Sequence, residues 1–329
     1  MNSWTPESLL AVTRGFMEAR VVLTAVELDL FTLLSRSPTS LEELISALKT
    51  TSRGTAILLD ALAGMGLLIK RDDRYTCPEE IARLLSADSP ATVLPMAKHA
   101  ASLWGRWSEL TNIVREGAAD RPPAVFEDKE ELAAFIGAMH VVAKRFAETV
   151  AAQVQAGAST NLLDIGGATA TYAEAFLRQY PRMRATVFDR PPVIELARKR
   201  LADTGLMDRL TLVPGDFYTD ELPDGHDLAL LSAIIHQNSP EQNLDLYKKV
   251  FRALTPGGRI LIRDHVMSSD RTQPRDGALF AVNMLVATSG GNCYTFEEIQ
   301  DSLRAAGFTP IRLLQSGEMM NALVEACRP

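Results

Sequence analysis

The chain has 329 residues, of which 47% are apolar and 23% charged, so it can bury a sizeable core, and its length fits two domains. A formal net charge of −7 without any basic run argues against a nucleic-acid partner. No apolar run approaches the ~18 residues of a membrane span, and we expect neither a signal peptide nor a membrane partner. Three cysteines far apart in the sequence (Cys77, Cys293 and Cys327) predict no disulfide and no metal site, and they fit a cytoplasmic location.

The first ninety residues predict helices followed by a small hairpin. Apolar residues recur at helical spacing over 16–35, and a hydroxyl residue at 39 or 40 precedes a glutamate by three positions, which is a helix-start signature. A third helix is predicted from residue 52 to the glycines at 64 and 66. A short strand at 67–70, a polar turn and a second extended segment at 75–77 complete the pattern of a winged helix.

A winged helix raises the question of DNA binding. The predicted recognition helix, about residues 52–63, is apolar and carries one basic residue, Arg53, so it is poorly suited to face phosphates. Burial against a second chain explains an apolar helix better. We therefore predict an interface between subunits, with a DNA-binding regulator as the alternative.

Further helices are predicted between residues 93 and 156. One carries Trp104 and Trp107, and a long one runs from Phe135 to Val154. We interpret this region as a lid or linker that contributes to an acceptor pocket.

From residue 161 onwards, short apolar strands alternate with helices. This alternation predicts an α/β fold with a parallel, doubly wound, Rossmann-like sheet. Ligands of such sheets bind at the carboxyl ends of the strands, so the residues that end each strand are the candidate site. The strands are predicted at 161–166, 184–189, 210–214, 227–232 and 258–264, with helices at 170–180, 192–202 and 240–254.

The first of these strands ends in an acid followed by glycines: Asp164, Gly166 and Gly167. Glycine allows the backbone to approach a ligand closely, but the dinucleotide fingerprint Gly-x-Gly-x-x-Gly does not fit this segment. A carboxylate so near the glycines is a poor neighbour for a pyrophosphate, and it suits a ligand that carries a sulfonium and an ammonium group. The segment therefore favours S-adenosylmethionine over NAD.

Two more acids end the next two strands. Asp189 can accept hydrogen bonds from both ribose hydroxyls, and Asp216 can accept one from the adenine amino group while Phe217 packs on the ring. A single aspartate is often no more than a helix cap. Three acids at three successive strand ends favour a cofactor site, to which we also assign Arg190 and Ser232.

The chain resembles, over nearly its whole length, the small-molecule O-methyltransferases related to caffeic acid and hydroxyindole O-methyltransferases. The matching motifs are LDIGG at 163–167, FDRPP at 188–192, GDFY at 215–218 and ALTPGGRILI at 253–262, with AVELDLF at 25–31. The resemblance implies S-adenosylmethionine as methyl donor, S-adenosylhomocysteine as product, and a homodimer whose subunits intertwine and lend residues to each other's pocket. It implies three parts: a dimerisation domain at 1–92, a helical linker or lid at 93–156, and a cofactor-binding domain at 157–329.

The resemblance also implies the catalytic residues. His236, which follows the fourth strand, matches the family's general base for the acceptor hydroxyl, and Asp264, which ends the fifth strand, matches the acid that orients it. Histidine suits this role, because its unperturbed pKa of about 6.5 leaves it largely neutral near pH 7. A lone histidine is more often structural, but its place at a strand end favours catalysis.

Three features depart from the family pattern. The chain reads HQN at 236–238, where His-Asp-Trp is typical; Cys293 stands where a second orienting acid is expected; and Ala168 and Ala170 replace glycines. A weaker base favours a more acidic acceptor or transfer driven by proximity. The alternative is a family member that binds the cofactor but performs hydroxylation or decarboxylation, and N- or C-methylation also stays open.

A few residues match or flank family positions at the acceptor pocket. The acceptor is expected to be a small aromatic or polyketide-like hydroxyl compound. Methionine at helical spacing usually belongs to a core, so core packing is the alternative, and His140 as a second base is a weaker one. The candidates are Trp104, Met139, His140, Gln237 and Met284.

Overall fold

The structure is a computed structural model that describes residues 4–117 and 129–329, and the chain divides into two compact units between Trp104 and Gly105. The division differs from the predicted boundaries at 92 and 156. It lies within helix α6 (Leu94–Ser108), and the helices that follow belong to the second unit. Within the described residues, none of the helices has the length and apolar character needed to cross a membrane.

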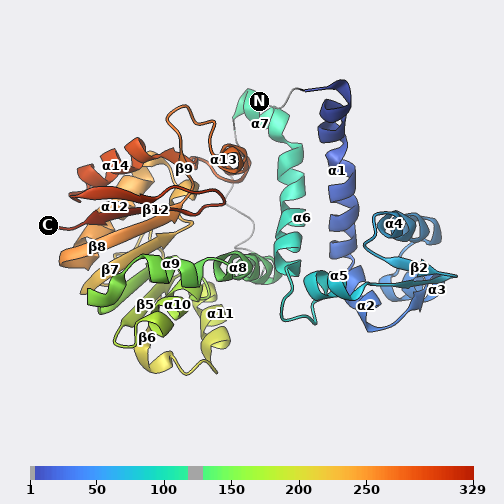
Figure 1. Ribbon diagram of the computed structural model, residues 1–329, viewed down its shortest axis with the longest axis horizontal. Helices are drawn as coiled ribbons and strands as arrows, with labels where there is room; N and C mark the ends of the chain where they lie inside the picture. The colour runs from blue at the N-terminus through green and yellow to red at the C-terminus, as the bar shows by residue number, and fades with distance from the viewer. Residues whose placement is uncertain (1–3, 118–128) are drawn as a thin grey trace. The chain divides into compact units, whose positions relative to one another are not determined.

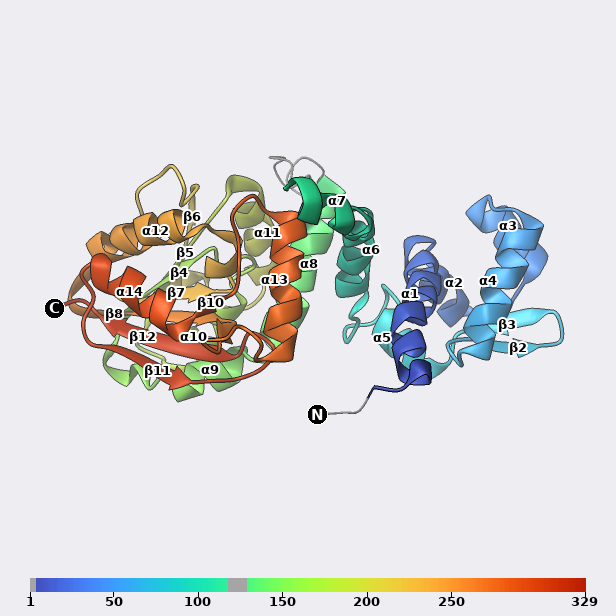
Figure 2. The same cartoon turned by 90° about the horizontal axis from the view of Figure 1, so that it is seen from above.

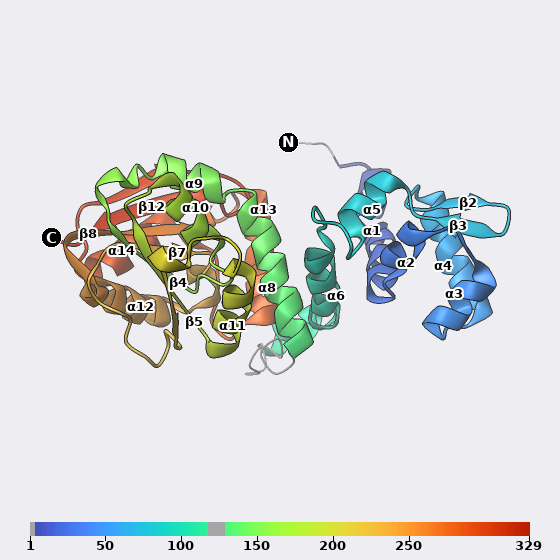
Figure 3. The same ribbon diagram turned by 90° about the horizontal axis from the view of Figure 1, so that it is seen from below.

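The first unit is built from helices and a small antiparallel sheet. The predicted helix over 16–35 is two helices, because Asp29 adopts a left-handed backbone with φ 53° between them. Strand β3 pairs with both β1 and β2, so the predicted hairpin is present (Figure 3). The elements are α1 (Pro6–Glu27), α2 (Leu30–Arg36), β1 (Thr39–Ser40), α3 (Leu41–Leu48), α4 (Ser52–Gly64), β2 (Ile69–Arg71), β3 (Arg74–Thr76) and α5 (Glu79–Leu85).

The second unit contains a seven-stranded sheet with the strand order β11-β12-β8-β7-β4-β5-β6. Its main strands are β4 (Asn161–Ile165), β5 (Arg184–Asp189), β6 (Leu210–Pro214), β7 (His226–Ser232), β8 (Leu254–Asp264), β11 (Ile311–Gln315) and β12 (Ala322–Cys327). Its α-helices are α7 (Leu110–Glu116), α8 (Lys129–Lys144), α9 (Ala147–Gln153), α10 (Thr171–Gln179), α11 (Pro191–Leu201), α12 (Pro240–Ala253), α13 (Arg275–Ala287) and α14 (Phe296–Ala305).

The five strands predicted from the sequence are present and parallel, and the α/β fold class is confirmed. Two strands that the sequence analysis did not identify extend this parallel sheet at one edge, where β12 pairs antiparallel with β8 and β11 pairs antiparallel with β12. A short connection can join only antiparallel neighbours, and only residues 316–321 separate these two strands.

One helical expectation also needs correction, and one segment has more structure than the sequence analysis assigned to it. The segment 265–295 contains α13 and two short parallel strands, β9 (Val266–Met267) and β10 (Tyr294–Thr295). The helix expected from Phe135 to Val154 is interrupted, since α8 ends at Lys144 and α9 begins at Ala147.

Helices cover both faces of the sheet (Figures 1 and 2). One face packs on α9, α10 and α11 around Phe176, and the other packs on α12 and α14 around Tyr247. The chain runs outward from β4 through β5 to β6, then returns to β7 on the other side of β4. The reversal between β4 and β7 opens the crevice in which doubly wound sheets bind ligands.

Candidate active site

The loop after β4 has a backbone that favours glycine. Gly166 has φ +66°, and a Cβ atom there would lie 2.4 Å from Cδ1 of Ile234, so a side chain does not fit. Ala168 and Ala170 also adopt left-handed conformations, with φ of 49° and 63°. A left-handed alanine is strained by about 1 kcal/mol. The loop therefore keeps a glycine-type conformation even where the sequence has alanine.

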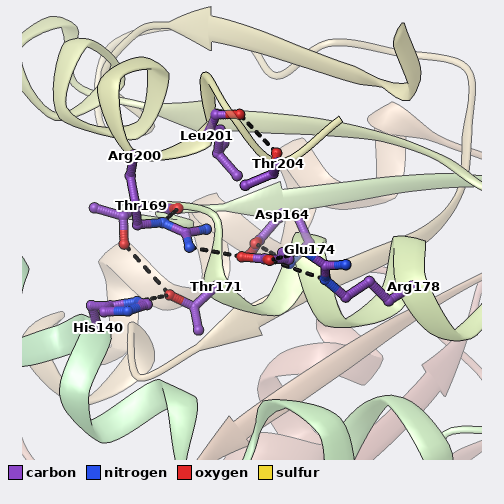
Figure 4. Close-up of polar contacts among 10 residues, drawn as sticks. His140, Asp164, Thr169, Thr171, Glu174, Arg178, Arg200, Leu201 and Thr204 are labelled. Carbon is purple, nitrogen blue, oxygen red and sulfur yellow. Dashed lines mark hydrogen bonds and ion pairs between the residues drawn. The ribbon is translucent and has the colours of Figure 1, made fainter. Parts of the chain in front are cut away.

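Two neighbouring helices hold this loop in place (Figure 4). Arg200 of α11 donates from Nε to the Thr169 carbonyl oxygen at 2.8 Å and from Nη1 to Glu174 at 2.7 Å. On the other side, Nδ1 of His140 in α8 lies 2.8 Å from the Thr171 hydroxyl. Burial, and secondarily nearby basic side chains, lower the pKa of His140. A neutral His140 thus links helix α8 to the start of α10.

Burial raises the pKa of each of the first two acids. Asp164 is buried and accepts one hydrogen bond, from the Ala173 amide at 3.3 Å, and burial raises its pKa to about 7. Asp189 accepts from the amides of Ala168 at 2.8 Å and Arg190 at 2.7 Å, yet lost hydration still raises its pKa to about 6. A cationic ligand would favour the ionised form of both carboxyl groups.

The third strand end lies against the same loop. Phe217 is close to the glycine turn, since a Cβ atom on Gly166 would lie 3.7 Å from its Cε1. Asp216 accepts from the Tyr218 amide at 2.9 Å, and its charge contributes to the raised pKa of Asp189. Ser232 ends β7 on the neighbouring side of β4. The structure thus brings together the residues predicted to bind the cofactor, with Gly167 and Arg190 in the adjoining loops.

His236 and Asp264 form a buried pair. Nδ1 of His236 lies 2.9 Å from both carboxylate oxygens of Asp264, which also accepts from the His265 amide at 2.8 Å. Burial alone would raise the pKa of Asp264, but His236 and the His265 amide outweigh it and lower that pKa. Phe280 packs against the His236 ring at right angles, with centroids 4.9 Å apart.

This geometry determines the roles of the two ring nitrogens. A carboxylate beside Nδ1 requires the proton to be on Nδ1, so Nε2 is the basic nitrogen of neutral His236. Among the residues that the structure describes, Nε2 has no hydrogen-bond partner. The pair can therefore accept a proton from a bound hydroxyl compound.

The departure from His-Asp-Trp introduces a buried polar hub that the sequence analysis missed. Asn238 accepts from the Tyr218 hydroxyl at 2.6 Å and donates to Asn243 at 3.0 Å, and Asn243 in turn donates to the Ile235 carbonyl at 2.9 Å. The Tyr294 hydroxyl donates to the backbone carbonyl of Asn238. These bonds fix the turn that carries His236. Polarity where an aromatic residue is typical was the available signal.

The segment around the missing second acid also contacts the histidine. The Asn292 amide donates to the His236 carbonyl at 2.8 Å, and a Cβ atom on Gly291 would lie 2.5 Å from that carbonyl oxygen. Cys293 is buried, and burial raises its thiol pKa to about 12, with a smaller contribution from Asp264. The residue in the place of the second acid is therefore a neutral thiol, and Asp264 is the carboxylate bonded to His236.

The residues expected at the acceptor pocket lie on several elements. Met139 is half-buried in α8, Met284 is buried in α13, and Gln237 is half-buried directly after His236. Trp104 is the last residue of the first unit, where the Arg20 guanidinium carbon lies 5.4 Å from its ring centroid. Their contact with an acceptor stays a prediction.

Comparison with known proteins identifies the family. Residues 107–309 match the O-methyltransferase domain, and residues 10–88 match the O-methyltransferase dimerisation domain. The chain belongs to the S-adenosylmethionine-dependent O-methyltransferases. The resemblance seen in the sequence motifs is thereby confirmed.

Two relatives and one solved structure illustrate the likeness to this methyltransferase. The tetracenomycin polyketide synthesis 8-O-methyl transferase TcmO of Streptomyces glaucescens is 32% identical, covering 93% of this chain and 92% of its own. The 3-hydroxy-5-methyl-1-naphthoate 3-O-methyltransferase of Streptomyces sahachiroi is 32% identical, covering 94% and 91%. The structure of PigF with SAH superposes with a TM-score of 0.90 at 26% identity, covering 99% and 100%.

Proposed function

We propose that this methyltransferase transfers a methyl group to the hydroxyl of a small aromatic metabolite, with His236 as general base. The observation that carries the proposal is the buried pair in which Asp264 holds Nδ1 of His236 and leaves Nε2 free for the acceptor. The two relatives support the acceptor class, since the name of one places it in polyketide synthesis and the name of the other specifies a hydroxynaphthoate.

The residues at the strand ends fit the cofactor chemically. We assign the ribose hydroxyls to Asp189, the adenine amino group to Asp216 and its ring to Phe217, while Asp164 faces the charged methionyl end. The raised pKa of Asp164 supports this assignment, because no basic side chain offsets the burial of this carboxyl group and S-adenosylmethionine would bring a cation. At Asp189 the charge of Arg190 and two backbone amides offset burial only in part, which leaves the carboxyl group free to accept hydrogen bonds from a ligand. When bound, the cofactor supplies an electrophilic methyl group on a sulfonium.

Loop geometry supports the same assignment. Gly166 and Gly167 keep the backbone close to the strand ends, with Arg190 and Ser232 at the rim of the same crevice. We assign to these four residues the contacts that orient the cofactor.

His236 removes the acceptor proton as the methyl group moves. A phenol with a pKa of about 10 is not deprotonated beforehand by an imidazole, so Nε2 takes the proton during transfer. Asp264 keeps the ring oriented and stabilises the imidazolium that forms. This assistance is typically worth about 10²- to 10⁴-fold in rate, and holding the reacting atoms in line supplies much of the rest.

Met139, His140, Gln237 and Met284 are our candidates for the acceptor wall in the second unit. His140 already uses Nδ1 for Thr171, so its part in the wall is to position α8.

Incubation with S-adenosylmethionine and a panel of hydroxynaphthalenes and hydroxyindoles, read by mass spectrometry, tests the function. Products one methylene unit heavier, with equimolar S-adenosylhomocysteine, are expected. Hydroxylated or decarboxylated products instead would favour the alternative chemistry.

We further propose a homodimer formed through the first unit. The match to the dimerisation domain supports it, and so does α1, on which Leu9, Val12 and Phe16 are 53%, 64% and 56% exposed at helical spacing. Sedimentation should give a dimer for the wild type and a monomer for the double variant Val12→Glu, Phe16→Glu. Leu314→Glu, at a similarly exposed residue of β11, is the control and should stay dimeric. A dimeric double variant would place the interface elsewhere.

A further inference from the structure

Arg263 is a cation enclosed in the second unit. It precedes Asp264 on β8, so strand alternation directs the two side chains to opposite faces of the sheet. Only 2% of the residue is exposed. Its guanidinium lies between two aromatic rings, with Cζ 4.9 Å from the ring centroid of Phe146 and 5.6 Å from that of Tyr172.

Aromatic rings are the sole close partners of this cation within the described part of the chain. Nε and Nη2 of Arg263 are sealed from solvent without a hydrogen bond, and so is the Tyr172 hydroxyl beside them. The nearby carboxylate of Asp264 already binds His236 and the His265 amide.

Such an arrangement is unfavourable unless a ligand completes it. A guanidinium stays charged in proteins, and burying it without a counter-ion is opposed by lost hydration. An apolar side chain of similar size would stabilise the fold more, which indicates a role in binding. Three of the six buried polar atoms without partners among the described residues belong to this one cluster, and that also indicates a ligand site.

The position of the cluster specifies the ligand. Tyr172 is in the first turn of α10, directly after the glycine-type loop, and Ser232 is close enough to its hydroxyl to affect its pKa. Ser232 also pairs with Arg263 across β7 and β8. We propose that Arg263, assisted by the Tyr172 hydroxyl, binds a carboxylate in the crevice: that of the cofactor's methionyl end or that of an acidic acceptor. The planar guanidinium matches the geometry of a carboxylate.

This inference rests on the proposed function, and a titration of the ligand-free protein can test it without measuring activity. Calorimetry would compare S-adenosylmethionine with its decarboxylated form, on the wild type and on Arg263→Met. If the carboxylate belongs to the cofactor, the wild type prefers S-adenosylmethionine by about 10- to 100-fold, because charge-assisted hydrogen bonds have that magnitude. Arg263→Met should bind both ligands with equal, weaker affinity, and Tyr172→Phe should lose part of the preference.

The acceptor arm uses the protein saturated with S-adenosylhomocysteine. If the carboxylate belongs to the acceptor, Arg263→Met leaves cofactor affinity within twofold. In that case the wild type should bind 3-hydroxy-2-naphthoate at least tenfold more tightly than 2-naphthol, and the variant should bind both alike. Unchanged preferences in both arms would overturn the inference. A wild type that binds neither S-adenosylmethionine nor S-adenosylhomocysteine would instead contradict the proposed function.

Thermal unfolding of the ligand-free variants separates binding from folding. Arg263→Met should be at least as stable as the wild type, because it removes a cation without a counter-ion. Arg259→Met on the same strand is the control: it breaks the ion pair with Glu325, at 2.6 Å, and should lower the melting temperature while leaving ligand preference unchanged. A lower melting temperature for Arg263→Met with intact carboxylate preference would assign Arg263 a structural role.

Discussion

Buried carboxyl groups at one edge of the same sheet have pKa values shifted in opposite directions. At the end of β8, Asp264 is fully buried, yet the adjacent His236 holds its pKa below the ordinary value. At the ends of β4 and β5, burial raises the pKa of Asp164 to about 7 and that of Asp189 to about 6. In the half of the crevice that we propose to be catalytic, the buried acid is paired with a histidine, whereas in the proposed cofactor half burial outweighs the contacts that stabilise the two ionised acids. This contrast fits proton transfer at the first half and ligand binding at the second.

The largest expected effect comes from removing the catalytic base. His236→Ala should lower kcat by about 10²- to 10⁴-fold, because the acceptor proton then has no positioned base. Calorimetry should show S-adenosylhomocysteine affinity within about threefold of the wild type, since the histidine is assigned to the acceptor.

The variant Asp264→Asn tests whether the orientation and tautomer of His236 matter for its proposed role as a base. An amide in place of the carboxylate can donate to Nδ1, which favours the tautomer with the proton on Nε2 and removes the base from the acceptor side. We expect kcat to fall by a factor no larger than that of His236→Ala, and cofactor affinity to hold. Full activity of either variant would show that proximity alone drives transfer.

On the cofactor half, Asp189→Asn should lower the affinity for S-adenosylmethionine by about 10- to 100-fold, because two charge-assisted hydrogen bonds to the ribose are weakened. The matched control is Asp227→Asn. Asp227 lies at the opposite end of the sheet and binds the amides of Thr160 and Asn161 at 2.8 and 3.0 Å. The control should change thermal stability without changing affinity. Equal losses of affinity in both variants would place the cofactor elsewhere.

The sequence located the residues of this half of the proposed site at strand ends for a physical reason. Parallel strands align their carboxyl ends, so an acid or glycine that ends a predicted strand, such as Asp189 or Gly166, can be placed without coordinates. The His236–Asp264 pair followed from the same rule combined with the family resemblance.

The missed features depend on contacts between segments far apart in the sequence. The enclosed guanidinium of Arg263 can be recognised only from the structure, in which Phe146 and Tyr172 pack against it. The hub at Asn238 forms because the side chains of Tyr218 and Asn243 converge on it from the β6–β7 connection and α12. The antiparallel strand β11 has three exposed central residues, so its sequence carries little of the apolar signal of a buried strand. Periodicity identifies individual elements but cannot predict these contacts.

A further expectation concerns pH and the two uncompensated acids. Because their ligand-free pKa values are raised to about 7 and about 6, part of Asp164 and Asp189 is protonated in weakly acidic solution. Cationic S-adenosylmethionine requires the ionised forms, so its affinity should rise with pH, by up to about tenfold per pH unit between pH 6 and 7, more steeply below pH 6 where both acids are protonated, and level off above pH 7. S-adenosylhomocysteine, which lacks the sulfonium charge, should show a shallower dependence in calorimetric titrations.

The stability of the ligand-free protein should depend on pH in the opposite direction from the cofactor affinity. A carboxyl group with a raised pKa contributes stability at low pH that is lost as pH rises, here between about pH 4 and 7 for Asp164. Relative to the wild type, Asp164→Asn should therefore gain melting temperature across that window and then level off. A constant difference from pH 4 to 8 would mean that the buried acid has an ordinary pKa.

The smallest expected effect concerns backbone strain in the loop after β4, on the proposed cofactor side of the crevice. Ala168 has φ 49°, where alanine is disfavoured and glycine is not. Ala168→Gly should stabilise the protein by about 0.5 kcal/mol, since relief of strain exceeds the added freedom of the unfolded chain. Ala133→Gly, at an exposed position within α8, should destabilise it by about 1 kcal/mol. Denaturant unfolding measures the free energy of unfolding of both variants. A lower free energy of unfolding in both would mean that the loop relaxes around its alanines. Backbone strain would then not distinguish the two halves of the crevice.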